Sequence, residues 1–274
     1  MPELPEVQVV KNFFDLQVVG KRISRVNIIN NKLRYQIPSR LNSKLSNLII
    51  SEILRRGKYL ILLFKNSDIS LLIHLGMTGY FRLNSFFKPE KHDHIAFQLT
   101  NEYLIFNDIR KFGFIKIYSA KNIFNCSHLK KIGIEPLSEE LNFKYFRDNC
   151  QRDIDLKTLL MDQSFLAGLG NIYCSEILFD ARLDPRKKSN SLLISEIKNL
   201  IESIKKILNK SIIHGGTTIK NFIVSNEKIG YFKNELKVYG RDNKSCFRCS
   251  ENEIIEKIKQ KGRSTFFCKK CQKY

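Results

Sequence analysis

The chain has 274 residues, 43% of them hydrophobic, which is enough for more than one buried core. Its 47 Lys and Arg residues exceed its 27 Asp and Glu residues, giving a formal net charge of +20. This charge favours a polyanionic partner, most often nucleic acid, although a compositional drift toward Lys, Asn and Ile explains part of it. We see no secretory signal and no apolar run near the ~18–20 residues of a membrane span, so we expect no membrane association.

The first half of the chain predicts a helix followed by short strands. Pro5 suits the first turn of a helix over 5–15, and Gly20 ends it. From about 21 to 118, apolar runs alternate with Asn, Gly, Ser and Asp, as in a sandwich or barrel. The predicted strands are 23–29, 48–54, 59–64, 69–75, 94–99, 103–106 and 114–118.

The pattern becomes helical beyond Gly133. An apolar stripe over 193–208 predicts a long helix that ends before Gly215 and Gly216. Another helix is predicted to begin near Asn171 and to end before Asp184, with its Gly-rich N-terminus available to a phosphate. An ordinary capped helix explains that turn equally well.

The C-terminus carries a metal-binding pattern. Cys246-x2-Cys249 and Cys268-x2-Cys271 are separated by a spacing that supplies four thiolates to one tetrahedral, structural Zn²⁺. Gly262 and the β-prone residues after it predict a two-stranded ribbon, with Arg263 presented near its turn. The other three cysteines, Cys126, Cys150 and Cys174, are scattered, which argues against a disulfide framework and for a reducing cytoplasm.

The N-terminus carries a candidate nucleophile. Removal of Met1 would leave Pro2 with a secondary amine whose pKa lies below that of lysine. Such an amine forms a cationic iminium with an aldehyde-like carbon, and Glu3 is placed to move the required protons. Taken alone, Pro2-Glu3 is more simply explained as an N-terminus from which Met1 is removed and which has no catalytic role. The full string PELPEV over 2–7 is much less expected by chance.

Three loops combine cations with aromatic or sulfur side chains. In Arg55–Leu60, Lys58 can bind a phosphate or move a proton, or the segment is a solvated turn. The loops 74–79 and 107–113 carry Met77, Arg110 and Phe112, which suit the filling of a hole in a base stack; packing and solvent exposure are the alternatives. In Lys91–His94 we favour a phosphate contact by His92 over a metal site.

These motifs together resemble the bacterial formamidopyrimidine-DNA glycosylase family, whose members remove oxidised purines. The resemblance runs from end to end and rests on motifs in matching order: 2–7, 55–60, 74–79, 91–94, 108–113, 161–173, 215–218, 230–232, 238–241 and the four cysteines. It implies a multidomain α+β protein. The expected parts are a β-sandwich catalytic domain with flanking helices at 1–132, a helix–two-turns–helix DNA-binding domain at 133–236 and a zinc ribbon at 237–274.

The resemblance also implies roles for single residues. Pro2 would attack C1′ of the damaged nucleoside and Glu3 would handle the protons, while Lys58 would assist β-elimination and Arg263 the second, δ, elimination. The implied partner is double-stranded DNA with damaged bases, bound by a monomer. The DNA-binding residues would be Met77, His92, Arg110, Phe112, Arg152, Asn171 and Lys220, the last in a mobile loop at 217–232 that closes over oxidised guanine.

Some residues depart from the family pattern. Ile109 and Ile229 stand where Pro is common, and Gln151-Arg152-Asp153 replaces a Lys-rich patch. Three rival functions fit parts of this pattern. Endonuclease VIII shares Pro-Glu and zinc but usually has Gly at the position of Leu4, a non-catalytic zinc-ribbon DNA-binding protein would not need Pro2, and a tautomerase would need neither zinc nor the positive charge.

Overall fold

The computed structural model describes residues 2–217, 231–249 and 253–274. Its chain forms two compact units, 1–130 with 214–231 and 131–213 with 232–274. No helix among the described residues has the length and apolarity needed to cross a bilayer. The expected three-part division into 1–132, 133–236 and 237–274 stays a prediction, because the cysteine ribbon clusters with the helical residues in the second unit.

The first unit opens with helix α1, Leu4–Gln17, close to the predicted 5–15. Pro5 lies in its first turn, and Glu3 and Glu6 form a capping box. This arrangement satisfies backbone N–H groups that the first helical turn leaves without partners. Phe14 on the buried face of α1 packs edge-to-face against Phe81, with ring centroids 5.0 Å apart. The catalytic candidates Pro2 and Glu3 are therefore attached to a helix anchored in the core.

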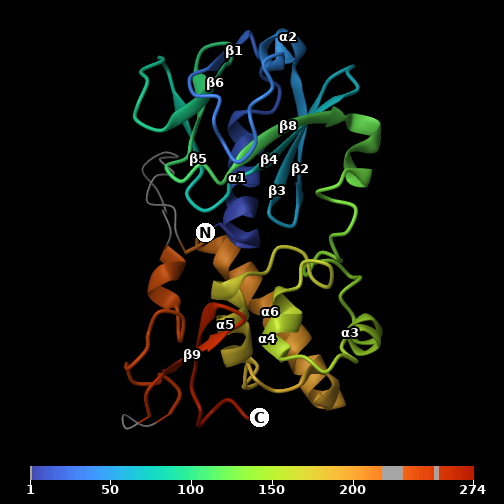
Figure 1. The fold of residues 1–274 in the computed structure, drawn as a ribbon, viewed down its shortest axis with the longest axis vertical. Helices are drawn as coiled ribbons and strands as arrows, with labels where there is room; N and C mark the ends of the chain where they lie inside the picture. Colours follow the sequence, from blue (N-terminus) through green and yellow to red (C-terminus); the bar gives the residue numbers. More distant parts are fainter. Residues whose placement is uncertain (1, 218–230, 250–252) are drawn as a thin grey trace. The chain divides into compact units, whose positions relative to one another are not determined.

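Eight strands form two four-stranded antiparallel sheets in this unit (Figure 1). The first sheet has the order β1-β6-β7-β5 and the second β2-β3-β4-β8. Apolar side chains from both sheets and from α1 share one core, which confirms the predicted sandwich with flanking helices. The strands are β1 Arg25–Ile28, β2 Ile50–Arg56, β3 Tyr59–Phe64, β4 Ile69–His74, β5 Tyr80–Asn84, β6 Asp93–Gln98, β7 Tyr103–Asn107 and β8 Phe114–Ser119; helix α2 is Leu41–Leu45 and the 3-10 helix η1 is Ala120–Asn125.

Strand β5 was absent from the sequence prediction. Its central Arg82 is buried, which breaks the apolar pattern that would identify a strand. Two guanidinium nitrogens donate to the buried carboxylate of Asp93 on β6, at 2.5 and 2.7 Å. A paired charge inside a sheet is rare enough that alternation alone does not reveal it.

The second unit contains the predicted long helix as α6, Ile194–Ile213, and the predicted Asn171 helix as α5, Asn171–Asp180. The shorter helices were not predicted, because each spans too few residues to show a clear period. They are α3 Phe143–Asn149 and α4 Leu156–Met161, with the 3-10 helices η2 Ser189–Ser191 and η3 Tyr231–Glu235. Helices α3 to α6 enclose a separate apolar core.

The predicted ribbon is present as β9, Glu256–Gln260, and β10, Arg263–Phe267, paired antiparallel. Gly262 lies in the turn with φ +78°, a left-handed conformation that glycine adopts without strain. A small cluster joins Phe179 of α5 to Phe266 and Cys268 of the ribbon. The ribbon thus packs on α5 and places Arg263 at the first position of β10.

Candidate active site and DNA interface

Glu3 and Glu6 form a buried carboxylate pair at the start of α1. Glu3 is 1% exposed, and Pro2 beside it is half-buried. The Glu3 N–H donates to Glu6 Oε2 at 2.8 Å, which fixes the backbone on which Pro2 and Glu3 are placed. A carboxylate held in this way next to a secondary amine can take up and return protons during attack on a sugar carbon.

Glu6 also binds a segment far along the chain. Its Oε1 accepts hydrogen bonds from Thr217 N at 2.8 Å and from Thr217 Oγ1 at 2.9 Å. Gly216, with φ +79°, comes so near that a Cβ there would lie 2.8 Å from the same oxygen. Glu6 therefore connects the N-terminus to the residue that precedes 218–230. From the sequence alone, Glu6 is expected only to suit the first turn of the helix; its position three residues after Glu3 is a capping-box signal.

Lys58 lies in the tight turn between β2 and β3, after Gly57 with φ +54°. It is close enough to His74 to affect that ring. Burial, followed by the charges of Lys58 and Arg34, lowers the pKa of His74 to about 4. His74 Nδ1 accepts the Gly76 N–H at 3.0 Å, so the neutral ring with its proton on Nε2 is the form that fits. The charges of Lys58 and Arg34 thus both act on this ring, and two neighbouring cations suit a phosphate site.

The predicted gap-filling side chains lie around one pocket. A cavity of about 700 Å³ is lined by Arg34, His74, Gly76, Met77, Arg110, Lys111 and Phe112. The Arg110 guanidinium lies 4.8 Å from the centroid of the Phe112 ring, and that ring is 44% exposed. An exposed aromatic ring beside a cation and a thioether is unusual for a water-facing loop and suits contact with bases.

His92 lies in the turn before β6 with φ +72°, an uncommon value for a residue with a side chain. Its neighbours hold this conformation: Asn107 Nδ2 donates to Lys91 O at 2.9 Å, and Asp108 N donates to His92 O at 3.1 Å. His94 is buried, with Nε2 3.0 Å from Asp108 O. His92 and His94 thus have different environments, which supports the preference for a phosphate contact over a shared metal.

In the second unit, Asn171 and Lys157 converge on the ribbon. Asn171 Nδ2 donates to Ser264 O at 2.9 Å. Lys157, which is 2% exposed, donates to the same oxygen at 3.2 Å and to Thr265 Oγ1 at 2.7 Å. All three bonds reach the two residues directly after Arg263, so α4 and α5 hold the strand that presents this guanidinium. Lys157 was not identified from the sequence, since a lone lysine in a short helix gives no signal.

The remaining predicted contacts differ in their surroundings. Arg152 Nη1 is ion-paired to Asp162 Oδ2 at 2.9 Å, and Asp162 also accepts the Ser164 N–H and hydroxyl. A guanidinium that already has a carboxylate partner gains less from a phosphate. Lys220 and most of the predicted loop at 217–232 lie outside the described residues.

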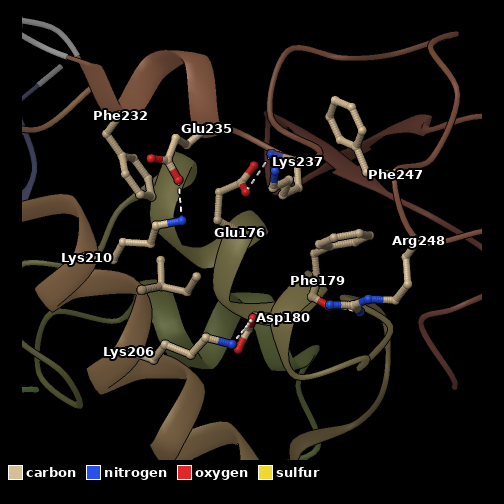
Figure 2. Close-up of a pocket in the computed structure, with 11 residues that line it drawn as sticks. Glu176, Phe179, Asp180, Lys206, Lys210, Phe232, Glu235, Lys237, Phe247 and Arg248 are labelled. Atoms are coloured by element: carbon tan, nitrogen blue, oxygen red, sulfur yellow. Dashed lines mark hydrogen bonds and ion pairs between the residues drawn. The ribbon is translucent and has the colours of Figure 1, made fainter. Parts of the chain in front are cut away.

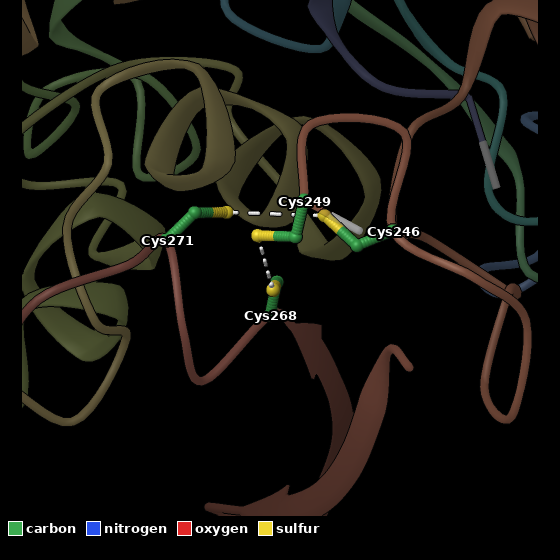
Figure 3. Close-up of side chains that lie close together, drawn as sticks. All are labelled: Cys246, Cys249, Cys268 and Cys271. Carbon is green, nitrogen blue, oxygen red and sulfur yellow. Dashed lines mark hydrogen bonds between the residues drawn. The ribbon is translucent and has the colours of Figure 1, made fainter. Parts of the chain in front are cut away.

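The four predicted cysteines come together at the end of the ribbon (Figure 3). Their sulfur atoms all lie within 4.8 Å of one another, with Cys246 to Cys271 at 3.9 Å and Cys249 to Cys268 at 3.7 Å. A tetrahedral zinc with Zn–S bonds of about 2.3 Å requires sulfur atoms roughly 3.8 Å apart. The cluster therefore fits one structural Zn²⁺, as predicted, and four thiolates leave no position for a substrate.

A second cavity, of about 330 Å³, lies among α5, α6, η3 and the start of the ribbon (Figure 2). Its charges are largely paired within it: Lys206 donates to Asp180 at 2.8 Å, and Lys210 pairs with Glu235. Buried Glu176 accepts the backbone N–H groups of residues 237, 238 and 239 at 2.8–3.0 Å. Glu176, which lines this cavity, therefore anchors the chain that leads into the ribbon.

Comparisons with known proteins match these features. Three family models match the chain: formamidopyrimidine-DNA glycosylase N-terminal domain over 1–115, formamidopyrimidine-DNA glycosylase H2TH domain over 132–223, and zinc finger found in FPG and IleRS over 253–273. Relatives named formamidopyrimidine-DNA glycosylase from Rickettsia africae and Rickettsia conorii are 46% and 47% identical over 276 residues, covering 99% of each chain. The chain belongs to the formamidopyrimidine-DNA glycosylase family.

Solved structures of this family also match. A Lactococcus lactis FPG mutant in complex with Fapy-dG-containing DNA superposes with a TM-score of 0.91 at 37% identity, covering 100% of both chains. A MutM complex with carbocyclic 8-oxo-G-containing DNA gives a TM-score of 0.90 at 38% identity, again covering 100% of both chains. These matches confirm the family resemblance and the α+β fold with a zinc finger.

Proposed function

We propose that this chain excises oxidised purines, namely 8-oxoguanine and formamidopyrimidines, from duplex DNA and then cleaves the strand. Membership of the glycosylase family supports this proposal, as do the full-length structural relatives that contain Fapy-dG and 8-oxo-G DNA. The observation that carries it is the buried Glu3 carboxylate beside Pro2, held by a capping box at the start of α1.

The proposed reaction begins at Pro2 after removal of Met1. The neutral secondary amine attacks C1′, the bond from C1′ to the base breaks, and the departing base takes up the proton that the amine loses. Glu3 supplies a proton to the sugar-ring oxygen, so that the ring opens and the nitrogen becomes an iminium. The iminium withdraws electrons from C1′ and acidifies the proton on C2′. Loss of that proton expels the 3′ phosphate, which is β-elimination.

Two cations are proposed to assist the later steps. Lys58 would contact a phosphate and help the first elimination, and Arg263 would support the loss of the 5′ phosphate in the second. Bonds from Lys157 and Asn171 to the strand that follows Arg263 support this role. The zinc would act only by holding the ribbon together.

The DNA contacts are proposed as follows. Met77, Arg110 and Phe112 fill the space left by the flipped nucleotide, and His92, Arg152, Asn171 and Lys220 contact phosphates. Unstacking a base costs a few kcal/mol, which the inserted side chains and the positive charge offset. The enzyme would act as a monomer in the bacterial cytoplasm, on the nucleoid, where its duplex substrate is found.

The proposal is tested by trapping the covalent intermediate. The protein is incubated with a duplex carrying one 8-oxoguanine opposite cytosine, borohydride is added, and the adduct is mapped by mass spectrometry. Borohydride reduces an iminium to a stable amine, so we expect one adduct on Pro2 of a chain that lacks Met1.

A duplex with an oxidised pyrimidine provides the comparison. Preferential adduct formation with that duplex would point to endonuclease VIII specificity. Intact binding with no adduct on any lesion would instead indicate a DNA-binding protein without catalysis.

A further inference from the structure

Two loops of the first unit that carry the proposed gap-filling side chains interlock through their backbones. One connects β4 to β5 and contains Gly76 and Met77; the other connects β7 to β8 and contains Phe112 and Gly113. Gly76 has φ +66°, and a Cβ there would overlap Gly113 N and lie 2.5 Å from Phe112 C. No side chain separates the loops at this point, so their backbones are in direct contact.

The carboxylate of Asp108 joins the same two loops. It is fully buried. Its Oδ1 accepts the Thr78 hydroxyl at 2.5 Å and the Arg110 N–H at 3.2 Å, while Oδ2 accepts the Gly113 N–H at 2.7 Å. Thr78 Oγ1 accepts the same Arg110 N–H at 3.0 Å. The hydroxyl of one loop thus lies between the carboxylate and the backbone of the other.

The main chain of Asp108 holds a third segment. Its N–H donates to His92 O at 3.1 Å, and its carbonyl oxygen lies 3.0 Å from His94 Nε2. Asp108 therefore contacts three segments through its backbone and side chain: the turn with Met77, the loop with Arg110 and the turn with His92. A carboxylate suits this place because it accepts several N–H and O–H donors at once without a hydrogen of its own to clash.

We propose that Asp108 and Thr78 are positioning residues that hold Met77, Arg110 and Phe112 as one preassembled unit. This inference rests on the proposed function, in which those three side chains fill the gap beside a flipped base. Preassembly matters because separate ordering of each loop at the moment of flipping would add to the entropy cost of insertion. Asp108 and Thr78 act through the loops and not on the reacting atoms.

The test compares a duplex substrate with a single-stranded one. Gap filling is needed only in a duplex, where the flipped base leaves an unpaired partner. In Thr78→Val and Asp108→Asn we expect single-turnover excision of 8-oxoguanine from duplex DNA to fall by about tenfold, the effect of a lost hydrogen bond to a charged group. Cleavage of a single-stranded abasic oligonucleotide should change by less than about twofold.

Matched variants control for damage to the fold. Thr78→Ser keeps the hydroxyl and should restore duplex excision. Ser119→Ala and Asp68→Asn remove a solvent-exposed hydroxyl–carboxylate bond in the same unit, Ser119 Oγ to Asp68 Oδ2 at 2.8 Å, and should leave both activities unchanged. A parallel fall of both activities in Thr78→Val, or no fall in either, would overturn the proposal.

Amide hydrogen exchange tests the coupling between the two loops and does not depend on a measurement of enzyme activity. Thr78→Val should accelerate amide exchange in residues 108–113, which lie on the other loop, whereas Thr78→Ser should not. Unchanged exchange there would refute the coupling. Wild-type protein that releases no oxidised purine would reject the proposed function and the role in base flipping with it, while accelerated exchange would still establish that the loops are joined.

Discussion

At the residue scale, the first turn of α1 concentrates the proposed chemistry in very few atoms. Glu3 and Glu6 are both buried, and each has a distinct task. Glu6 uses one oxygen for the Glu3 N–H and the other for Thr217, so it is engaged in structure. Glu3 is the residue proposed as the acid or base beside Pro2, and its side chain also accepts the Glu6 N–H in the capping box.

Replacing Glu3 by Gln should separate binding from catalysis. The amide keeps the size of the side chain but cannot exchange protons, so base release should fall by about 10²-fold or more. Affinity for lesion DNA, measured by fluorescence anisotropy, should stay within about threefold of wild type. Glu52→Gln, on the exposed side of β2, serves as the control. Near-normal excision by Glu3→Gln would refute the proton role.

His74 should make stability depend on pH. Its pKa is lowered to about 4 in the folded chain, so the unfolded chain binds a proton first as the pH falls below about 6.5. Stability therefore decreases from pH 7 to pH 5, by about 1–2 kcal/mol once partial exposure is allowed for. Urea unfolding of wild type and His74→Gln at both pH values measures the difference. An equal decrease in both proteins would contradict the assignment.

At the scale of elements, the ribbon is small, and its position depends on a few anchors in the second unit. Lys157 from α4 and Asn171 from α5 reach Ser264, and Glu176 of α5 caps three N–H groups of the chain that leads into the ribbon. Polar anchors of this kind specify one orientation, because each leaves a buried unpaired group if the ribbon shifts.

Lys157→Met should loosen the strand that presents Arg263. Loss of hydrogen bonds from a buried ammonium group should lower the free energy of unfolding by about 2 kcal/mol. The ratio of δ- to β-elimination product should fall, while zinc content stays at one per chain. Lys188→Met removes an exposed ion pair and should change neither quantity. An unchanged product ratio in Lys157→Met would show that Arg263 does not depend on this anchor.

Removal of zinc should act locally. The ribbon is too small to fold on apolar contacts alone, so chelation should unfold it and abolish DNA binding. The sandwich has its own core and should keep its β-sheet circular dichroism. Tight binding by fully metal-stripped protein would contradict this expectation, and readdition of Zn²⁺ provides the reversal control.

The elements that the sequence predicted well are those in which apolar residues recur at a clear helical or strand spacing. Strand β3 was predicted with its observed bounds, and α6 from its apolar stripe. Strand β5 was not predicted because Arg82 is buried with Asp93, and α4 because it spans six residues. In the site, the cysteines follow from spacing, whereas the roles of Asp108 and Lys157 depend on partners distant in sequence.

At the scale of the whole molecule, the net charge of +20 is a long-range property. It attracts the phosphate backbone and raises the rate of encounter at low salt. Few of these charges need to touch DNA. Among the residues proposed to contact a phosphate or to assist its loss, Lys58, Lys220 and Arg263 are cations, as is Arg152, which already has Asp162 as partner.

The salt dependence of DNA binding should therefore correspond to the neutralisation of about three phosphates. Because each neutralised phosphate contributes about −0.9, log K against log salt should have a slope near −3 for duplex with an uncleavable abasic analogue. Lys58→Met should make the slope about 0.9 less steep, and Arg152→Gln should change it by less, because Asp162 already pairs with that guanidinium. A large change for Arg152→Gln would mean that DNA displaces Asp162.

The bond between Glu6 and Thr217 spans 211 residues and orders events during synthesis. At about 5–20 residues per second, Thr217 leaves the ribosome roughly 10–40 s after Glu6. Until then, Glu6 cannot make its two hydrogen bonds to Thr217. The N-terminal segment that carries the proposed nucleophile is thus translated first, while this part of its surroundings is completed late in translation.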